Sequence, residues 1–190
     1  FQSGGDTLLT QSLIKHCAPT LAGLKTASLF SCPFTQPKEL GRAVTAYNRE
    51  LRPAGVAITI LKQSATFALI YVYRPTYLAK DLAPAEVQKF LAPYGYQQHS
   101  ITSALALLRA RCRNAEPFPH EIGLFLGYPL ADVVGFIQNG GKNCKCAGYW
   151  KVYHNEKEAL QRFAQFRQCR DIYWRCFCQG KSLQQLTVVA

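Results

Sequence analysis

The sequence predicts a single α+β domain in which a mixed or antiparallel sheet of about four strands packs with several helices. Hydrophobic residues make up 48% of the 190 residues and charged residues only 17%, which excludes a disordered chain and a coiled coil. Apolar runs with helical spacing alternate with short β-branched and aromatic runs. The length suits one domain, expected over residues 4–190, because residues 1–3 have the character of a tag remnant.

The first third of the chain supplies helices and an opening strand. A short amphipathic helix is expected over 7–17, with Pro19 beginning a new segment, and residues 25–32 form a candidate strand. A helix is predicted over 37–51, because its apolar residues follow a 4-3-4 spacing and a proline stands in its first turn.

A β-hairpin is predicted next. Residues 56–61 and 67–73 are β-branched and aromatic runs joined by five mostly polar residues. The second run is apolar on both faces of the expected strand, which is typical of a central strand covered on both sides.

The rest of the chain is mainly helical. Pieces of helix are expected within 76–139, a strand over 149–153, and a long helix from 156 to about 179 that ends at Gly180. The order of elements also fits a ferredoxin-like sheet with a helical insertion before its last strand.

Net charge favours anionic partners. Twenty-two Lys and Arg against eleven Asp and Glu give a net charge of +11. Basic residues alternate with aromatic residues at 71–74, 149–153 and 173–175, as on surfaces that stack single-stranded nucleic acid. The same pattern also arises in strands that pack a core on one face. No Gly-rich phosphate loop, nucleophile elbow or dinucleotide fingerprint is present.

Cysteine content points to a reducing compartment. Eight cysteines without a secretion signal are expected to be reduced thiols in a cytoplasmic protein. The least polar stretch, residues 122–137, is shorter than a membrane span and contains Asp132, so we expect no membrane insertion.

Cys17 and His120 are the candidate catalytic pair. If Pro19 began a short helix, Cys17 would lie near its N-terminus, where the helix dipole stabilises a thiolate. His120 would then act as the base, held by the prolines that precede it. Burial of Cys17 as a small core residue is the competing interpretation.

Metal binding by cysteines is the second candidate chemistry. Cys144 and Cys146 stand two apart, as do Cys176 and Cys178, but the second pair falls in a predicted helix, where residues two apart diverge. A four-cysteine zinc site is therefore disfavoured.

Three blocks, residues 16–32, 118–129 and 148–153, resemble a bacterial family catalogued as domain of unknown function 3793, found largely in Firmicutes. The resemblance extends to the tail at 180–188 and implies no particular activity, substrate or cofactor. It implies a family pattern of residues, of which Cys17, Cys32, Cys146 and His16 are candidate ligands for a soft metal such as zinc or iron, and Lys25, Glu121, Trp150 and Lys151 candidate binding residues.

Two functional hypotheses follow for a protein whose biochemical function is unknown. The first is a thiol- or metal-dependent site around Cys17 and His120. The alternative is a non-catalytic basic module that binds nucleic acid or another anionic partner. A third interpretation is that these same residues only pack a core and have no functional role.

Overall fold

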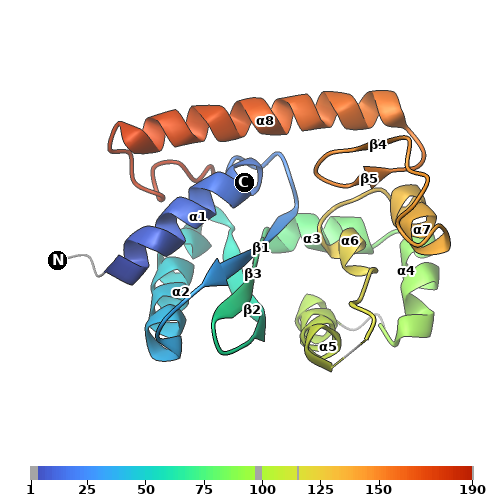
Figure 1. The fold of residues 1–190 in the computed structure, drawn as a ribbon, viewed down its shortest axis with the longest axis horizontal. Coiled ribbons are helices and arrows are strands. Elements are labelled where there is room, and N and C mark those ends of the chain that lie inside the picture. Colours follow the sequence, from blue (N-terminus) through green and yellow to red (C-terminus); the bar gives the residue numbers. More distant parts are fainter. Residues whose placement is uncertain (1–3, 97–99, 115, 190) are drawn as a thin grey trace.

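A three-stranded antiparallel sheet forms the centre of the fold, and helices cover both of its faces (Figure 1). The computed structural model describes residues 4–96, 100–114 and 116–189, so the predicted tag remnant lies outside the described residues. The α+β class is as predicted.

The sheet has the order β1-β3-β2. Strands β1 (Ala27–Pro33), β2 (Ala57–Gln63) and β3 (Phe67–Tyr73) pair so that Phe30 and Ile60 both lie opposite Ile70. The apolar run of β3 is therefore the central strand, as the sequence predicts. Alternate residues of β3 enter two different cores, because successive side chains point to opposite faces.

The connection between β1 and β2 is helix α2 (Pro37–Leu51), whose bounds are those predicted. The two strands are parallel with β3 between them, which is the split βαβ unit of a ferredoxin-like sheet. The fourth strand of such a sheet was expected at 149–153, and this expectation is wrong. Instead β5 (Lys151–Val152) pairs with β4 (Cys146–Ala147) in a separate ribbon, because a tight turn brings the two segments together locally.

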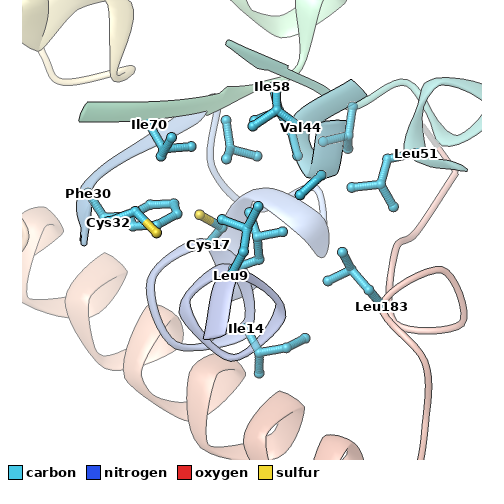
Figure 2. Close-up of a cluster of buried hydrophobic side chains, with 14 of the residues drawn as sticks. Leu9, Ile14, Cys17, Phe30, Cys32, Val44, Leu51, Ile58, Ile70 and Leu183 are labelled. Carbon is cyan, nitrogen blue, oxygen red and sulfur yellow. The ribbon is translucent and has the colours of Figure 1, made fainter. Parts of the chain in front are cut away.

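One face of the sheet packs against α1 (Gly4–Leu21), α2 and the C-terminal part of α8 (Glu156–Cys178). Figure 2 shows this first core, with Cys17, Phe30 and Ile70 among its buried side chains. Helix α1 is longer than expected, because it continues through Pro19 instead of ending before it. A proline removes one helical hydrogen bond, and here the helix goes on for less than a turn beyond it.

The opposite face packs against a second core built by the middle of the chain. The buried hydroxyl of Tyr71 in β3 donates to the carbonyl oxygen of Phe125 at 2.5 Å and ties the sheet to this layer. Its helices are α3 (Pro75–Leu82), α4 (Ala85–Leu91), α5 (Ile101–Asn114), α6 (Ile122–Phe125) and α7 (Leu130–Gln138), and 3₁₀ turns follow α2 and α4 at Arg52–Ala54 and Ala92–Tyr94.

Helix α8 links the two ends of the molecule (Figure 1). It begins at its predicted start, residue 156, where the side chain of Asn155 accepts from the backbone N–H of Glu158 at 3.4 Å. Its last turns pack on α1, and its first turns cover the β4–β5 ribbon through Phe163 and Phe166. In the part of the chain that the structure describes, no helix is long and apolar enough to cross a membrane.

Candidate functional site

A pocket lies between the α6–α7 segment and the β4–β5 ribbon. Its volume is about 350 Å³, within the range of small-molecule sites. Most of its lining is aromatic or aliphatic, and its polar side chains are few. The lining consists of Phe118, His120, Ile122, Gly123, Leu126, Tyr128, Asp132, Val133, Phe136, Ala147, Gly148, Trp150 and Lys151. We call this cavity the aromatic pocket.

Two stacked rings form one wall of the aromatic pocket. The rings of Tyr128 and Trp150 lie 5.0 Å apart with an interplanar angle of 28°. The rings of Trp150 and Phe163 in α8 pack edge to face, with centroids 4.6 Å apart and an interplanar angle of 79°. The Tyr128 hydroxyl donates to the carbonyl oxygen of Tyr149 at 3.0 Å. Contacts on several sides therefore fix the plane of this wall.

Asp132 holds the wall in place from the first turn of α7. One carboxylate oxygen accepts from the indole N–H of Trp150 at 2.8 Å. The other accepts from the backbone N–H groups of Tyr153 and His154 at 2.8 and 2.9 Å. Asp132 is 3% exposed, and these three donors stabilise its buried negative charge. It therefore positions the ribbon and the indole together.

Gly148 lets the ribbon approach α8 closely. A Cβ atom at this position would lie 2.3 Å from the ring of Phe163, a distance that real side chains do not tolerate. The turn between β4 and β5 thus requires glycine for packing, since Phe163 is buried and cannot move aside.

Two side chains give the aromatic pocket its polar character. The His120 ring lies 5.0 Å from that of Phe136, tilted by 59°. The ammonium group of Lys151 donates to the carbonyl oxygen of Gly141 at 2.6 Å and lies 5.8 Å from the centre of the Phe136 ring. The pocket therefore combines flat apolar walls with one lysine charge, one imidazole and the carboxylate of Asp132, which the protein's own donors already hold.

Comparison with known proteins gives a family and no activity. Residues 13–187 match a family described as protein of unknown function (DUF3793). The chain belongs to the DUF3793 family. Searches of curated proteins and of solved structures found no match. The resemblance predicted from the three sequence blocks is thus confirmed. The family description assigns no activity to this DUF3793 protein.

The structure does not support the reactive thiol that we expected at Cys17. Because α1 continues through Pro19, Cys17 lies near the C-terminus of a helix, where the dipole disfavours a thiolate. Its side chain is fully buried in the first core (Figure 2), and this burial raises the pKa of the thiol far above its ordinary value. His120 lines the aromatic pocket, and no hydrogen bond or ring contact in the described part of the chain pairs it with Cys17.

The four candidate metal ligands are also dispersed. Cys32 lies with Cys17 in the first core, where its thiol faces the carbonyl oxygen of Pro33 at 3.5 Å. His16 stacks on Phe30 at 5.2 Å, and Cys146 belongs to the β4–β5 ribbon. Among the residues that the structure describes, no three His, Cys, Asp or Glu side chains gather as a metal ion would require.

The remaining candidates divide between the aromatic pocket and buried polar clusters. Trp150, Lys151 and His120 line the same pocket. Glu121, next to His120 in sequence, turns away from it: its carboxylate accepts from Arg111 at 2.5 Å and from the Tyr96 hydroxyl at 3.2 Å. This pair, in which Glu121 is buried and Arg111 partly exposed, packs α5 against α6 and leaves Glu121 in a structural role.

Lys25 is buried beside Cys17 and donates to the carbonyl oxygen of Ala27, with its ammonium group 5.3 Å from the centre of the Tyr128 ring. Burial lowers its pKa from 10.5 to about 8, partly offset by Cys17. Between about pH 8 and pH 10.5 the lysine is more often protonated in the unfolded chain than in the native protein, so this group makes stability rise with pH. Below about pH 8 the lysine is charged in both states, and the full cost of burying its charge lowers the stability.

We therefore expect Lys25→Met to stabilise the protein most below pH 7. The gain in the free energy of unfolding over wild type should shrink by about 1 kcal/mol between pH 7 and pH 9, because the wild-type lysine becomes neutral over that interval. Urea unfolding of both proteins across this pH range measures the difference. A gain that stayed constant up to pH 9 would show that Lys25 keeps its ordinary pKa.

Three aromatic residues of the pocket, Phe118, Tyr128 and Phe136, were not predicted from the sequence. Aromatic side chains in apolar segments look the same in sequence whether they fill a core or line a cavity. The one signal that distinguished this region was the proline-flanked block around His120, which the resemblance also covers.

Proposed function

We propose that this DUF3793 protein is a binding protein for a small planar ligand that carries an anionic group, and that the aromatic pocket is the binding site. One combination carries the proposal. A rigid wall of two stacked rings, Tyr128 and Trp150, lies in the same pocket as the positively charged side chain of Lys151. His120, predicted as a catalytic base, takes the role of a binding residue here.

The aromatic walls favour a flat ligand. Stacked or edge-on contact with an aromatic ring is most favourable at centroid distances of about 4.5–7 Å, so a planar ring system can pack against the aromatic lining of such a pocket. The Tyr128–Trp150 wall is held by Asp132 and by Phe163 before any ligand arrives, which lowers the entropy cost of binding.

The charges of the pocket favour an anion. Asp132 is the acidic residue in the lining, and both of its oxygens already accept hydrogen bonds from the protein. The Lys151 ammonium donates one of its three hydrogens to Gly141, which leaves others for a carboxylate or a similar group. The net charge of +11 would also attract an anion from solution.

Binding is favoured over thiol or metal chemistry at this pocket. The Cys17 thiol is buried in another core, and the pocket lining includes no cysteine among the described residues. The His120 ring lies against the ring of Phe136, and among the described residues no hydrogen bond joins the imidazole to an acidic side chain, as a catalytic dyad would require. The arrangement therefore favours recognition over thiol chemistry.

Two ligands of the same shape and opposite charge test the proposal. We expect indole-3-propionate to bind at least ten-fold more tightly than tryptamine in isothermal titration calorimetry at pH 7. Lys151→Met should weaken indole-3-propionate about ten-fold, the effect of about 1.4 kcal/mol, and leave tryptamine no weaker.

Lys142→Met is the matched control, because Lys142 is exposed nearby and does not line the pocket. The control should bind both ligands as wild type does. Equal affinity for the two ligands, or an equal loss in the Lys142 variant, would contradict an anion site at Lys151.

A further inference from the structure

The outer face of α2 forms a shallow basic groove. Small residues and long basic side chains line a depression of about 510 Å³. The lining residues are Lys38, Gly41, Arg42, Thr45, Ala46 and Arg49, which we call the α2 basic groove. A Cβ atom added at Gly41 would have no other part of the protein within 4 Å. A partner can therefore approach the helix backbone there.

The helical spacing aligns the three positive charges. Lys38, Arg42 and Arg49 are exposed and, together with Thr45, fall within an arc of about 60° on the helix surface. They extend along about 16 Å of the axis. Glu39 and Glu50 lie about 100° round the helix from this row, so the acidic residues of α2 do not interrupt it.

The charges of the groove are available to a partner. The ion pairs found in the described part of the chain are Arg111–Glu121, Arg162–Glu158 and Arg170–Asp171, and none involves α2. Lys38, Arg42 and Arg49 therefore contribute their full charge to the surface. An anion that binds them displaces solvent and counterions and breaks no internal contact.

The opposite face of α2 is fixed in the protein. Leu40, Val44 and Leu51 are buried in the first core (Figure 2 labels Val44 and Leu51). The side-chain amide of Asn48 donates to the carbonyl oxygen of Ile58 at 2.7 Å and accepts from its backbone N–H at 2.8 Å. The apolar face is thus not free to enter a membrane, as it would be in an interfacial amphipathic helix.

From this geometry we propose that the α2 basic groove binds the phosphodiester backbone of nucleic acid without reading its sequence. A straight row of unpaired cations matches a linear polymer of regularly spaced negative charges better than the scattered carboxylates of an acidic protein. The groove has no aromatic lining on which a base can stack, so the contacts are to phosphates. The inference is independent of the aromatic pocket.

Charge reversal along the groove tests it. The probe is a fluorescein-labelled 20-base-pair DNA duplex of arbitrary sequence, followed by fluorescence anisotropy from 50 to 300 mM NaCl. We expect the wild type to bind in low salt and the triple variant Lys38→Glu, Arg42→Glu, Arg49→Glu to bind at least thirty-fold more weakly. The slope of log affinity against log salt should fall in magnitude by about 3, one unit for each lost phosphate contact.

The matched control reverses three exposed basic residues of α8, Lys157→Glu, Arg167→Glu and Arg175→Glu, and so changes the net charge equally. It should weaken binding less than three-fold at 150 mM NaCl. Equal losses in both variants would show that only net charge matters, and would overturn the assignment to α2.

Two further results would also overturn the proposal. One is the absence of duplex binding by the wild type in low salt. The other is tighter binding to vesicles of phosphatidylserine and phosphatidylcholine than to the duplex, with the same loss in the α2 variant, since the groove would then serve a lipid surface. Circular dichroism and the urea midpoint of each variant establish that it is folded.

Discussion

Replacing Arg74 with Met is expected to lower the free energy of unfolding by at least about 3 kcal/mol. Arg74 is fully buried, and its guanidinium group donates to four backbone carbonyl oxygens. These belong to Thr20 and Leu21 at 2.7 Å, Val188 at 2.8 Å and Ala54 at 3.1 Å. Methionine can fill much of the space, but all four carbonyl groups lose their charged donor. Those of Thr20 and Leu21 then keep only the backbone N–H groups of Gly23 and Val188 as donors.

The effect should be large because these carbonyls belong to three separate segments. Thr20 and Leu21 end α1, Ala54 ends the turn after α2, and Val188 lies in the C-terminal tail, whose backbone N–H also donates to Leu21 at 3.0 Å. One side chain therefore satisfies the end of a helix and joins it to two distant parts of the chain.

Urea unfolding measures this loss, with Arg167→Met as the control. Arg167 is exposed on α8, and its substitution should change the free energy of unfolding by less than about 0.5 kcal/mol. A loss for Arg74→Met no larger than that of the control would mean that the buried guanidinium does not hold these segments together.

Replacing Asp132 with Ala is expected to destabilise the protein by about 3 kcal/mol and to abolish ligand binding in the aromatic pocket. The substitution leaves the indole N–H of Trp150 and two backbone N–H groups of the ribbon without their acceptor. Since the same contacts fix the Tyr128–Trp150 wall, stability and binding should be lost together.

Asp132→Asn should lie between wild type and Asp132→Ala. Its single carbonyl oxygen can still accept from the ribbon, while its amide group faces the indole N–H without accepting from it. Asp171→Ala is the control, because Asp171 is exposed in an ion pair on α8 and should cost less than about 1 kcal/mol. Urea unfolding measures the change in stability, and calorimetry with indole-3-propionate measures the change in binding. Binding by Asp132→Ala as tight as that of wild type would contradict the claim that Asp132 holds the ligand-binding wall in place.

Elements with a strong local pattern were predicted well. The 4-3-4 apolar spacing of α2, the two apolar runs of the β2–β3 hairpin and the stripe of α8 are properties of neighbouring residues, and all three form as expected. Helix α1 was predicted too short, because a proline usually marks a helix boundary. Its last turn depends on Arg74, which lies far away in sequence.

The candidate site was predicted only in part. Trp150, Lys151 and His120 were named from the sequence and meet in one pocket. Cys17 was predicted as a nucleophile and Cys32 as a metal ligand, but the chemistry of both thiols is decided by burial, which depends on the packing of α1 against the sheet. The aromatic walls depend on the separate ribbon, and the sequence placed that segment in the main sheet instead.

The most direct test of the ligand site observes Trp150 itself. The chain has two tryptophans, so the indole region of a ¹⁵N–¹H spectrum should contain two signals, assigned with a Trp174→Phe variant. Trp150 lines the aromatic pocket, whereas Trp174 packs on the first core beside Lys15 and serves as an internal reference. On titration with indole-3-propionate we expect the Trp150 signal to move and saturate while the Trp174 signal stays in place. A Trp150 signal that did not move, or equal movement of both signals, would contradict a ligand site in this pocket.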